Sequence, residues 1–187
     1  MSHLSPRTVQ RRQTLLFSAT VPDGIRDTAD LDKNCVFINT LKEGEENTHK
    51  HVPQQYLIVP WAETFAATVA VLEKCFKEDP KHCKVMIFFT TARMTGLFYE
   101  MLSALKSQSS KGDILNAVPV SQIHSRMQQG ARMRVAKDFG EASSAILCSS
   151  DVTARGMSFP KVTQVLQIGI PQNSDQYIHR LGRTARE

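Results

Sequence analysis

Short apolar runs alternate with amphipathic stretches along most of this chain, and this alternation restricts its possible folds more than any other feature. The clearest run, Lys84–Phe89, is apolar without a two-residue period, as expected for a strand covered on both faces. Apolar residues from Met94 to Leu105 then recur at helical spacing. Strands separated by helices of ten or more residues indicate a parallel sheet, so we predict an α/β fold with helices on both faces.

The same patterns predict the other elements. The predicted strands are residues 14–17, 35–38, 55–59, 84–89, 118–123, 145–148 and 162–168. The predicted helices are residues 23–31, 62–77, 94–105 and 129–139, followed by a final helix that Asn173 and Gln176 would cap. Residues 40–53 are polar and lack periodicity, which indicates a linker. We therefore divide the chain into residues 1–39, a linker at 40–53, and a main domain at 54–187.

Composition excludes several classes of protein. With 187 residues, 41% of them hydrophobic, the chain can bury one sizeable core and a fragment of another. The net charge of +5 permits an anionic partner without identifying it. No apolar run approaches the roughly 18 residues that span a membrane, so we predict no membrane partner.

The cysteines and the amino-terminal arginines are also informative. The four cysteines form no CxxC pair and have no histidine at zinc-ligand spacing, so we predict no metal site and a reducing, intracellular compartment. Adjacent His82 and Cys83 are interpreted as surface neighbours rather than ligands. Arg7, Arg11 and Arg12 superficially resemble a transit peptide. They run into a predicted strand within a few residues, so we interpret them as a loop.

Polar segments follow three of the predicted strands. Thr90 and Thr91 follow residues 84–89, residues 124–129 follow 118–123, and residues 149–158 follow 145–148. In parallel sheets, ligands bind beyond the carboxyl ends of the strands. These segments offer hydroxyls, amides and guanidinium groups, which are the contacts that phosphate and sugar oxygens receive. A binding site at this edge is therefore predicted.

The end of the chain concentrates cations beside an apolar stripe. If a helix persists through residues 176–186, His179, Arg183 and Arg186 fall within a roughly 60° arc, at about 100° per residue. Guanidinium groups at fixed spacing suit a polyphosphate, because each can bind its oxygens bidentately. The alternative interpretation is an ordinary solvated basic helix end.

Several segments together resemble the DEAD-box RNA helicases, over essentially the whole chain. Ser18, Ala19 and Thr20 resemble motif III, Asp151 to Gly156 resemble motif V, and His179 to Arg186 resemble motif VI. Residues 86–91 resemble motif IV, and residues 124–139 resemble the neighbouring RNA-contacting motif. Residues 165–171 and 184–186 are most similar to the fungal mitochondrial group, which would imply a mitochondrial location.

The resemblance implies a RecA-like second helicase lobe, preceded in residues 1–39 by a short remnant of the first lobe. It implies that Arg183 and Arg186 are arginine fingers toward ATP and that His179 links the lobes. It also implies a coupling role for the SAT motif of residues 18–20. The implied nucleotide-binding residues are Gly156, Ser158, Arg183 and Arg186. The implied RNA-binding residues are Thr91, Ser125, Arg132 and Ser150.

The chain departs from the family pattern in ways that matter. Ser158 stands where the family usually has an aspartate that binds the ribose, and Ser125 stands where it has a glycine that allows close approach to RNA. The sequence contains no GxxxxGK[ST] loop and no Asp-Glu-Ala-Asp motif. ATP and Mg²⁺ would therefore be held mainly by a first lobe. We expect the isolated chain to lack ATPase activity.

Two functions remain open on the sequence alone. One is a helicase lobe that hydrolyses ATP and unwinds RNA only with its first lobe. The other is a stand-alone, non-enzymatic fragment that binds RNA or has a regulatory role. The spacing of Arg183 and Arg186 favours the first, because a pure RNA binder needs no arginine fingers. A different RecA-like motor is a third possibility, which the combination of motifs III and VI disfavours.

Overall fold

The computed structural model describes residues 15, 36, 38, 52–108, 114–151 and 159–184. The chain divides into two units, Met1–Glu45 and Glu46–Glu187, and the second holds nearly all of the described residues. Most of the predicted remnant, most of the linker and the predicted helix at residues 23–31 lie outside the described residues. The predicted domain boundaries therefore stay predictions.

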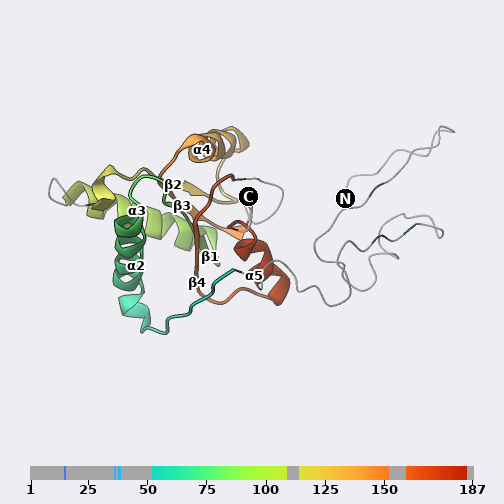
Figure 1. The fold of residues 1–187 in the computed structure, drawn as a ribbon, viewed down its shortest axis with the longest axis horizontal. Helices are drawn as coiled ribbons and strands as arrows, with labels where there is room; N and C mark the ends of the chain where they lie inside the picture. The colour runs from blue at the N-terminus through green and yellow to red at the C-terminus, as the bar shows by residue number, and fades with distance from the viewer. Residues whose placement is uncertain are drawn as a thin grey trace. The chain divides into compact units, whose positions relative to one another are not determined.

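The second unit alternates helices and strands along the chain (Figure 1). In order, its elements are η2 (Trp61–Glu63), α2 (Thr64–Glu78), β1 (Lys84–Phe89), α3 (Ala92–Gln108), η3 (Ile114–Ala117), β2 (Val120–Ile123), α4 (Gln129–Glu141), β3 (Ala145–Ser149), β4 (Gln164–Ile168) and α5 (Ser174–Leu181).

The four strands form one parallel sheet in the order β2-β3-β1-β4. Phe88 of β1 lies level with Ser149 of β3 on one side and with Gln167 of β4 on the other. Ile123 of β2 lies level with Ser149. All four strands therefore end at the same edge of the sheet.

Each face of the sheet carries its own apolar core. The side chains of Val85, Ile87 and Phe89 point to the face that α2 and α3 cover, where they pack with residues such as Phe76 and Phe98. The alternate residues Met86 and Phe88 point to the other face, where Phe139 of α4 packs. β1 and β3 are buried throughout, which explains their apolar sequence without alternation. The predicted α/β fold with helices on both faces is confirmed.

Most of the helical patterns are also confirmed, with two differences. On α2, Leu72 and Phe76 are fully buried, as the spacing predicts. On α3, Leu97 is 52% exposed although the same spacing places it on the apolar face, and Phe98 and Leu102 of that helix are buried in the core instead. The final helix ends at Leu181 rather than persisting to Arg186.

The predicted strand at residues 55–59 is wrong. These residues belong to no strand, and Tyr56 and Ile58 are 90% and 86% exposed. A strand needs a neighbour to accept its backbone hydrogen bonds, and no strand in the described part of the chain pairs with this segment. The described residues of the other two early strands, Leu15, Val36 and Ile38, likewise have no regular structure and are exposed. A run of apolar residues is therefore not sufficient for strand formation here.

No helix in the described ranges is long and apolar enough to cross a membrane.

Candidate nucleic-acid and nucleotide site

Three of the predicted RNA-binding residues follow strand ends at the carboxyl edge of the sheet. Ser125 follows β2, Ser150 follows β3 and Thr91 follows β1, and these strands are adjacent in the sheet. The backbone N–H of Ser150 donates to the carbonyl of Ile123 at 3.1 Å, which joins the end of β2 to the residue after β3. The fold thus places these three residues along one edge, as predicted.

Thr91 caps the helix that follows it. Its hydroxyl accepts a hydrogen bond from the backbone N–H of Met94 at 3.2 Å, and its carbonyl accepts one from the hydroxyl of Thr95 at 2.9 Å. The Thr91 side chain is exposed. Because a hydroxyl that accepts can still donate its own proton, Thr91 can offer an O–H to a phosphate oxygen.

Ser125 lies in a tight turn that His124 holds in shape. Nδ1 of His124 accepts a hydrogen bond from the backbone N–H of Arg126 at 3.3 Å. The backbone carbonyl of His124 accepts one from the backbone N–H of Met127 at 3.1 Å. Burial lowers the pKa of His124 below its ordinary value, and the nearby Arg126 lowers it further. The imidazole is therefore neutral at pH 7, as an Nδ1 acceptor must be. Ser125 itself is exposed at the tip of the turn.

Arg132 lies in the first part of α4, half-buried beside the same edge. Its Nη2 donates to the side-chain oxygen of Gln129, one turn earlier. Its Nε is buried without a hydrogen-bond partner within the described structure. A buried donor without a partner is costly and is often found where a ligand completes the site.

α5 begins with the predicted cap. The side-chain oxygen of Asn173 accepts from the backbone N–H of Gln176 at 2.8 Å, and the Gln176 side chain accepts from that of Gln172 at 2.6 Å. This reciprocal pattern satisfies two backbone donors at the start of the helix, so the predicted capping pair is confirmed. The cap fixes where the helix starts and hence which residues face the sheet.

The cations of the final segment do not form the simple outward face that a continuous helix would give. Arg183 lies in the turn after α5, is only 6% exposed, and donates from Nε to the carbonyl of His179 at 3.3 Å. Nδ1 of His179 is buried and lacks a partner among the described residues. Two predicted site residues, His179 and Arg132, therefore share this unusual property.

Sequence analysis missed Arg180, which is the most deeply placed charged residue of the segment. Its side chain is fully buried, and its Nε and Nη2 donate to the two carboxylate oxygens of Asp151 at 2.7 and 3.0 Å. Nη1 donates to the Gln167 side chain at 3.5 Å, and the guanidinium lies 5.7 Å from the centre of the Phe88 ring. The spacing of His179, Arg183 and Arg186 does not reveal that Arg180 is the cation that faces the core.

Gly169, directly after β4, is a second residue that sequence analysis missed. Its φ is +84°, and a Cβ built there would lie 3.1 Å from the Thr90 methyl carbon. Glycine adopts this left-handed backbone readily, whereas other residues do not. The glycine therefore lets the chain turn at the edge of the sheet close to Thr90.

The remaining predicted site residues lie outside the described residues. They are Ser18, Ala19, Thr20, Gly156, Ser158 and Arg186. Among the residues that are described, no group of three or more His, Cys, Asp or Glu side chains could hold a metal ion.

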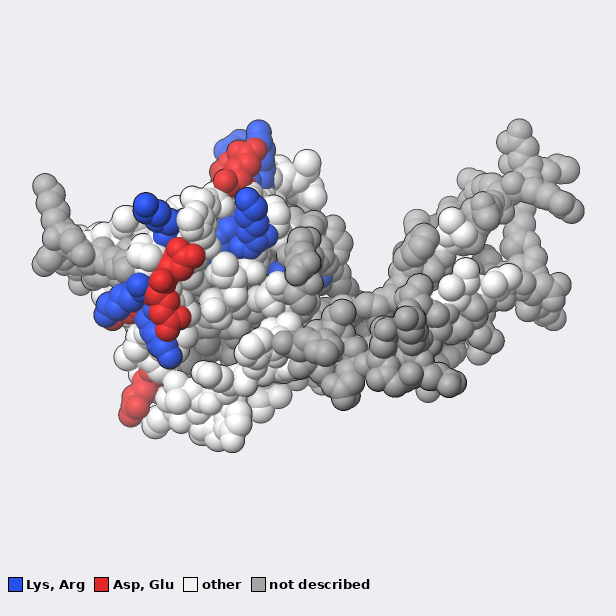
Figure 2. All heavy atoms as spheres, viewed as in Figure 1, with Lys and Arg blue, Asp and Glu red and all other residues white. Residues whose placement is uncertain are grey.

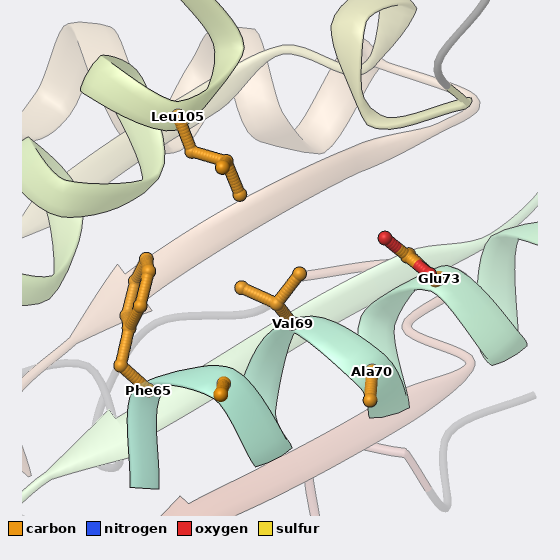
Figure 3. Close-up of a pocket in the computed structure, with 6 residues that line it drawn as sticks. Phe65, Val69, Ala70, Glu73 and Leu105 are labelled. Atoms are coloured by element: carbon orange, nitrogen blue, oxygen red, sulfur yellow. The ribbon is translucent and has the colours of Figure 1, made fainter. Parts of the chain in front are cut away.

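Two surface features do not mark the nucleotide site. Figure 2 shows acidic and basic side chains intermixed on the viewed face, so no single-sign patch dominates that face. A groove of about 350 Å³ between α2 and α3 is lined by Phe65, Val69, Ala70, Glu73, Leu105 and Ala66 (Figure 3). It is apolar except for the carboxylate of Glu73, and it contains none of the predicted site residues. An apolar groove with one acid does not suit a triphosphate.

The match to a known family covers most of the chain. Residues 67–187 match the model of the helicase conserved C-terminal domain. This chain belongs to that family. The matched range contains all four strands and every predicted RNA-binding residue.

Relatives with high similarity to this chain include DEAD-box helicases. The chain is 46% identical to DEAD-box ATP-dependent RNA helicase 26 of Oryza sativa subsp. japonica, with 95% of this chain and 31% of the relative aligned. It is 41% identical to the mitochondrial ATP-dependent RNA helicase MSS116 of Phaeosphaeria nodorum, covering 93% of this chain and 30% of the relative. The chain thus spans about a third of the length of these relatives.

Solved structures show the same lobe. Domain 2 of the DEAD-box helicase Mss116p, bound to an RNA duplex, superposes with a TM-score of 0.57 at 38% identity, covering 67% of this chain and 46% of that one. Mss116 bound to single-stranded RNA and UDP-BeF gives a TM-score of 0.58 at 38% identity, covering 67% and 23%. The resemblance to a DEAD-box helicase C-terminal, RecA-like lobe is therefore confirmed.

Proposed function

We propose that this chain is the second lobe of an ATP-dependent DEAD-box RNA helicase and acts with a first lobe of the same protein. The observation that carries the proposal is a convergence at one edge of the sheet. Thr91 and Ser150 lie at that edge, and α5, which bears His179, packs over the same strands through Arg180. A stand-alone RNA binder would need Thr91 and Ser150 but would not need His179 at the same edge.

On the RNA side, Thr91, Ser125, Arg132 and Ser150 contact the sugar-phosphate backbone. Hydroxyls and a guanidinium suit phosphate oxygens and read no base, so binding is independent of sequence. The unpartnered Nε of Arg132 supports this role, because a phosphate oxygen would satisfy it. The RNA duplex on domain 2 of Mss116p supports it independently.

On the nucleotide side, Arg183 and Arg186 stabilise the negative charge on the γ-phosphate, and His179 contacts the first lobe. Gly156 and Ser158, which lie outside the described residues, contact the nucleotide as well. When bound, ATP supplies the phosphoanhydride bond whose hydrolysis drives the lobes through closure and reopening. Arginine fingers at such a site contribute about 10³–10⁵ in rate.

The described residues fit this nucleotide only as half of a site. Arg183 and His179 are N–H donors suited to phosphate, whereas no cluster of acids in the described part of the chain could hold Mg²⁺. We therefore assign Mg²⁺ and most of the ATP contacts to the first lobe. The Nε of Arg183 donates to the carbonyl of His179, and its two terminal nitrogens carry further N–H groups that can donate to a phosphate.

We also propose a mitochondrial location within the cell. The fungal relatives are named as mitochondrial proteins, whereas the names of the rice relatives give no compartment. Fractionation of cells that express the tagged protein tests this assignment, and a purely cytosolic signal contradicts it.

RNA binding by the 187-residue chain tests the RNA-side assignment. Fluorescence anisotropy with a short RNA duplex, repeated over a range of salt concentrations, gives both the affinity and the salt slope. Arg132→Gln should weaken binding and reduce the magnitude of the slope by about one. Lys77→Gln, an exposed charge change on α2, is the matched control and should change neither. An unchanged slope in Arg132→Gln contradicts the assignment.

A further inference from the structure

Arg180 joins three strands at the edge where the predicted RNA and nucleotide residues meet. It pairs bidentately with Asp151 after β3, donates to Gln167 of β4, and lies over the Phe88 ring of β1. Phe88 lies level with Gln167 in the sheet, so these contacts fall in one row. A side chain held at three points in this way has a single orientation.

The chain neighbours of this pair belong to different parts of the site. Asp151 directly follows Ser150, a proposed RNA contact. Arg180 directly follows His179 and precedes Arg183 by three residues, and both are proposed to act on the nucleotide side. The pair therefore connects the two sets directly, through one bidentate contact.

Stability alone does not explain a fully buried guanidinium at this position. Arg180 lies on the face of the sheet where Met86 and Phe88 pack with Phe139 in an apolar core. Apolar residues of similar volume often replace buried ion pairs without loss of stability. A bidentate pair instead fixes the angle and the register between the two segments that it joins.

We propose that Asp151 and Arg180 are positioning residues that couple RNA binding at the loop after β3 to the placement of α5 and the turn after it. RNA on Ser150 fixes the Asp151 carboxylate, which fixes Arg180 and, through it, His179 and Arg183. This inference rests on the proposed function. It goes beyond that function by stating how RNA binding at Ser150 changes the placement of His179 and Arg183.

Hydrogen exchange on the 187-residue chain tests the coupling without ATP. The amides of Gly182, Arg183 and Thr184 are hydrogen-bonded to carbonyls of α5, with Gly182 to Ile178 at 2.8 Å, so their exchange reports on this turn. Adding a short RNA duplex should slow their exchange in the unaltered chain. Arg180→Lys keeps the positive charge but loses the bidentate contact with Asp151. Its affinity for RNA should stay within about twofold of that of the unaltered chain, while the protection that RNA adds to these amides disappears.

A second variant covers the case in which Arg180→Lys does not fold. The double change Asp151→Asn with Arg180→Gln removes both charges and retains an amide-to-amide hydrogen bond. It should bind RNA and lose the added protection in the same way. If neither variant unfolds cooperatively, the pair serves stability and the inference is overturned.

The two-lobe helicase supplies a second readout. With a first lobe attached, Arg180→Lys should lower the stimulation of ATPase by RNA about fivefold or more, while ATPase without RNA changes less. Lys77→Gln is again the control. If Arg180→Lys keeps both the amide protection that RNA adds and the stimulation of ATPase by RNA, this inference is overturned and the proposed function stands. Failure of the unaltered chain to bind RNA overturns the proposed function and this inference with it.

Discussion

The carboxylate of Asp151 accepts two hydrogen bonds from the guanidinium of Arg180, yet the two partners are buried to different degrees. The Arg180 side chain is fully buried, whereas the Asp151 side chain is 30% exposed. Removing one partner leaves the other charge unpaired, and the penalty depends on how much water can still reach it. The two single substitutions should therefore have unequal effects.

Asp151→Ala should destabilise the chain more than Arg180→Met. The first leaves a buried guanidinium without its carboxylate, at a cost of about 3–5 kcal/mol. The second leaves a partly solvated carboxylate and puts an apolar side chain against Phe88, at a cost of about 1–3 kcal/mol. Urea unfolding of both variants measures the difference. Equal costs, or the reverse order, contradict this description of the pair.

Gly169→Ala should cost at least about 1–2 kcal/mol, because a left-handed backbone is unfavourable for alanine. Its Cβ would also press on the Thr90 methyl, at 3.1 Å. Gly140→Ala is the matched control, since it lies in α4 with nothing within 4 Å of its Cβ, and it should gain about 0.5–1 kcal/mol. Thermal unfolding of the two variants tests the contrast, and a neutral Gly169→Ala contradicts it.

Lys84→Met tests a buried amine. The side chain is 1% exposed, and its Nζ donates to the carbonyls of Gly140 and Pro160 at 3.1 and 3.0 Å, 4.9 Å from the centre of the Phe139 ring. The variant leaves both carbonyls without this donor. It should lose about 1–3 kcal/mol at pH 7.

The deficit of Lys84→Met should widen at alkaline pH. Burial lowers the pKa of Lys84 below its ordinary 10.5, and the nearby Lys161 lowers it further. Between the folded and unfolded pKa values, the unfolded state therefore binds more protons, and stability gains from this group as pH rises. The neutral amine still donates to both carbonyls. Unfolding measured at rising pH up to about 10.5 should show this trend, and a narrowing deficit contradicts it.

Two thiols should resist labelling in the native state. Burial raises the pKa of Cys148 to about 12 and that of Cys83 to about 11. The interpretation of Cys83 as a surface residue is therefore wrong, because its side chain packs in the core, whereas His82 is exposed. Each pKa unit lowers the thiolate fraction about tenfold, and only the thiolate reacts. Cys148 should therefore react at pH 8 about a thousandfold more slowly than in urea. Peptide mapping by mass spectrometry separates it from the other cysteines, and rapid native labelling contradicts its burial.

Local patterns predicted the elements that pack on both sides. β1 has the predicted ends, because a strand covered on both faces is apolar throughout and the polar residues Thr90 and Thr91 follow this one directly. The cap at Asn173 was predicted because it depends only on residues within one turn. The loops at the carboxyl edge were predicted because parallel strands all end on one side of the sheet.

Features that depend on distant partners were not predictable. The segment from Tyr56 to Ile58 has the composition of a strand, but its pairing depends on a neighbour that no local pattern reveals. Arg180 and Asp151 are far apart in the sequence, and only the fold brings them into contact. The end of α5 at Leu181 is different, because Gly182 follows it directly and a glycine after a helical pattern is a local signal for the end of a helix.

RNA-stimulated ATPase on recombining two lobes tests the central claim most directly. The 187-residue chain should show no ATPase activity alone. Mixed with a separately expressed first lobe of a DEAD-box relative, it should restore RNA-stimulated hydrolysis, and Arg183→Lys should reduce that rate by about 10³ or more. ATPase activity from the chain alone, or no gain on mixing two folded lobes, would contradict the account.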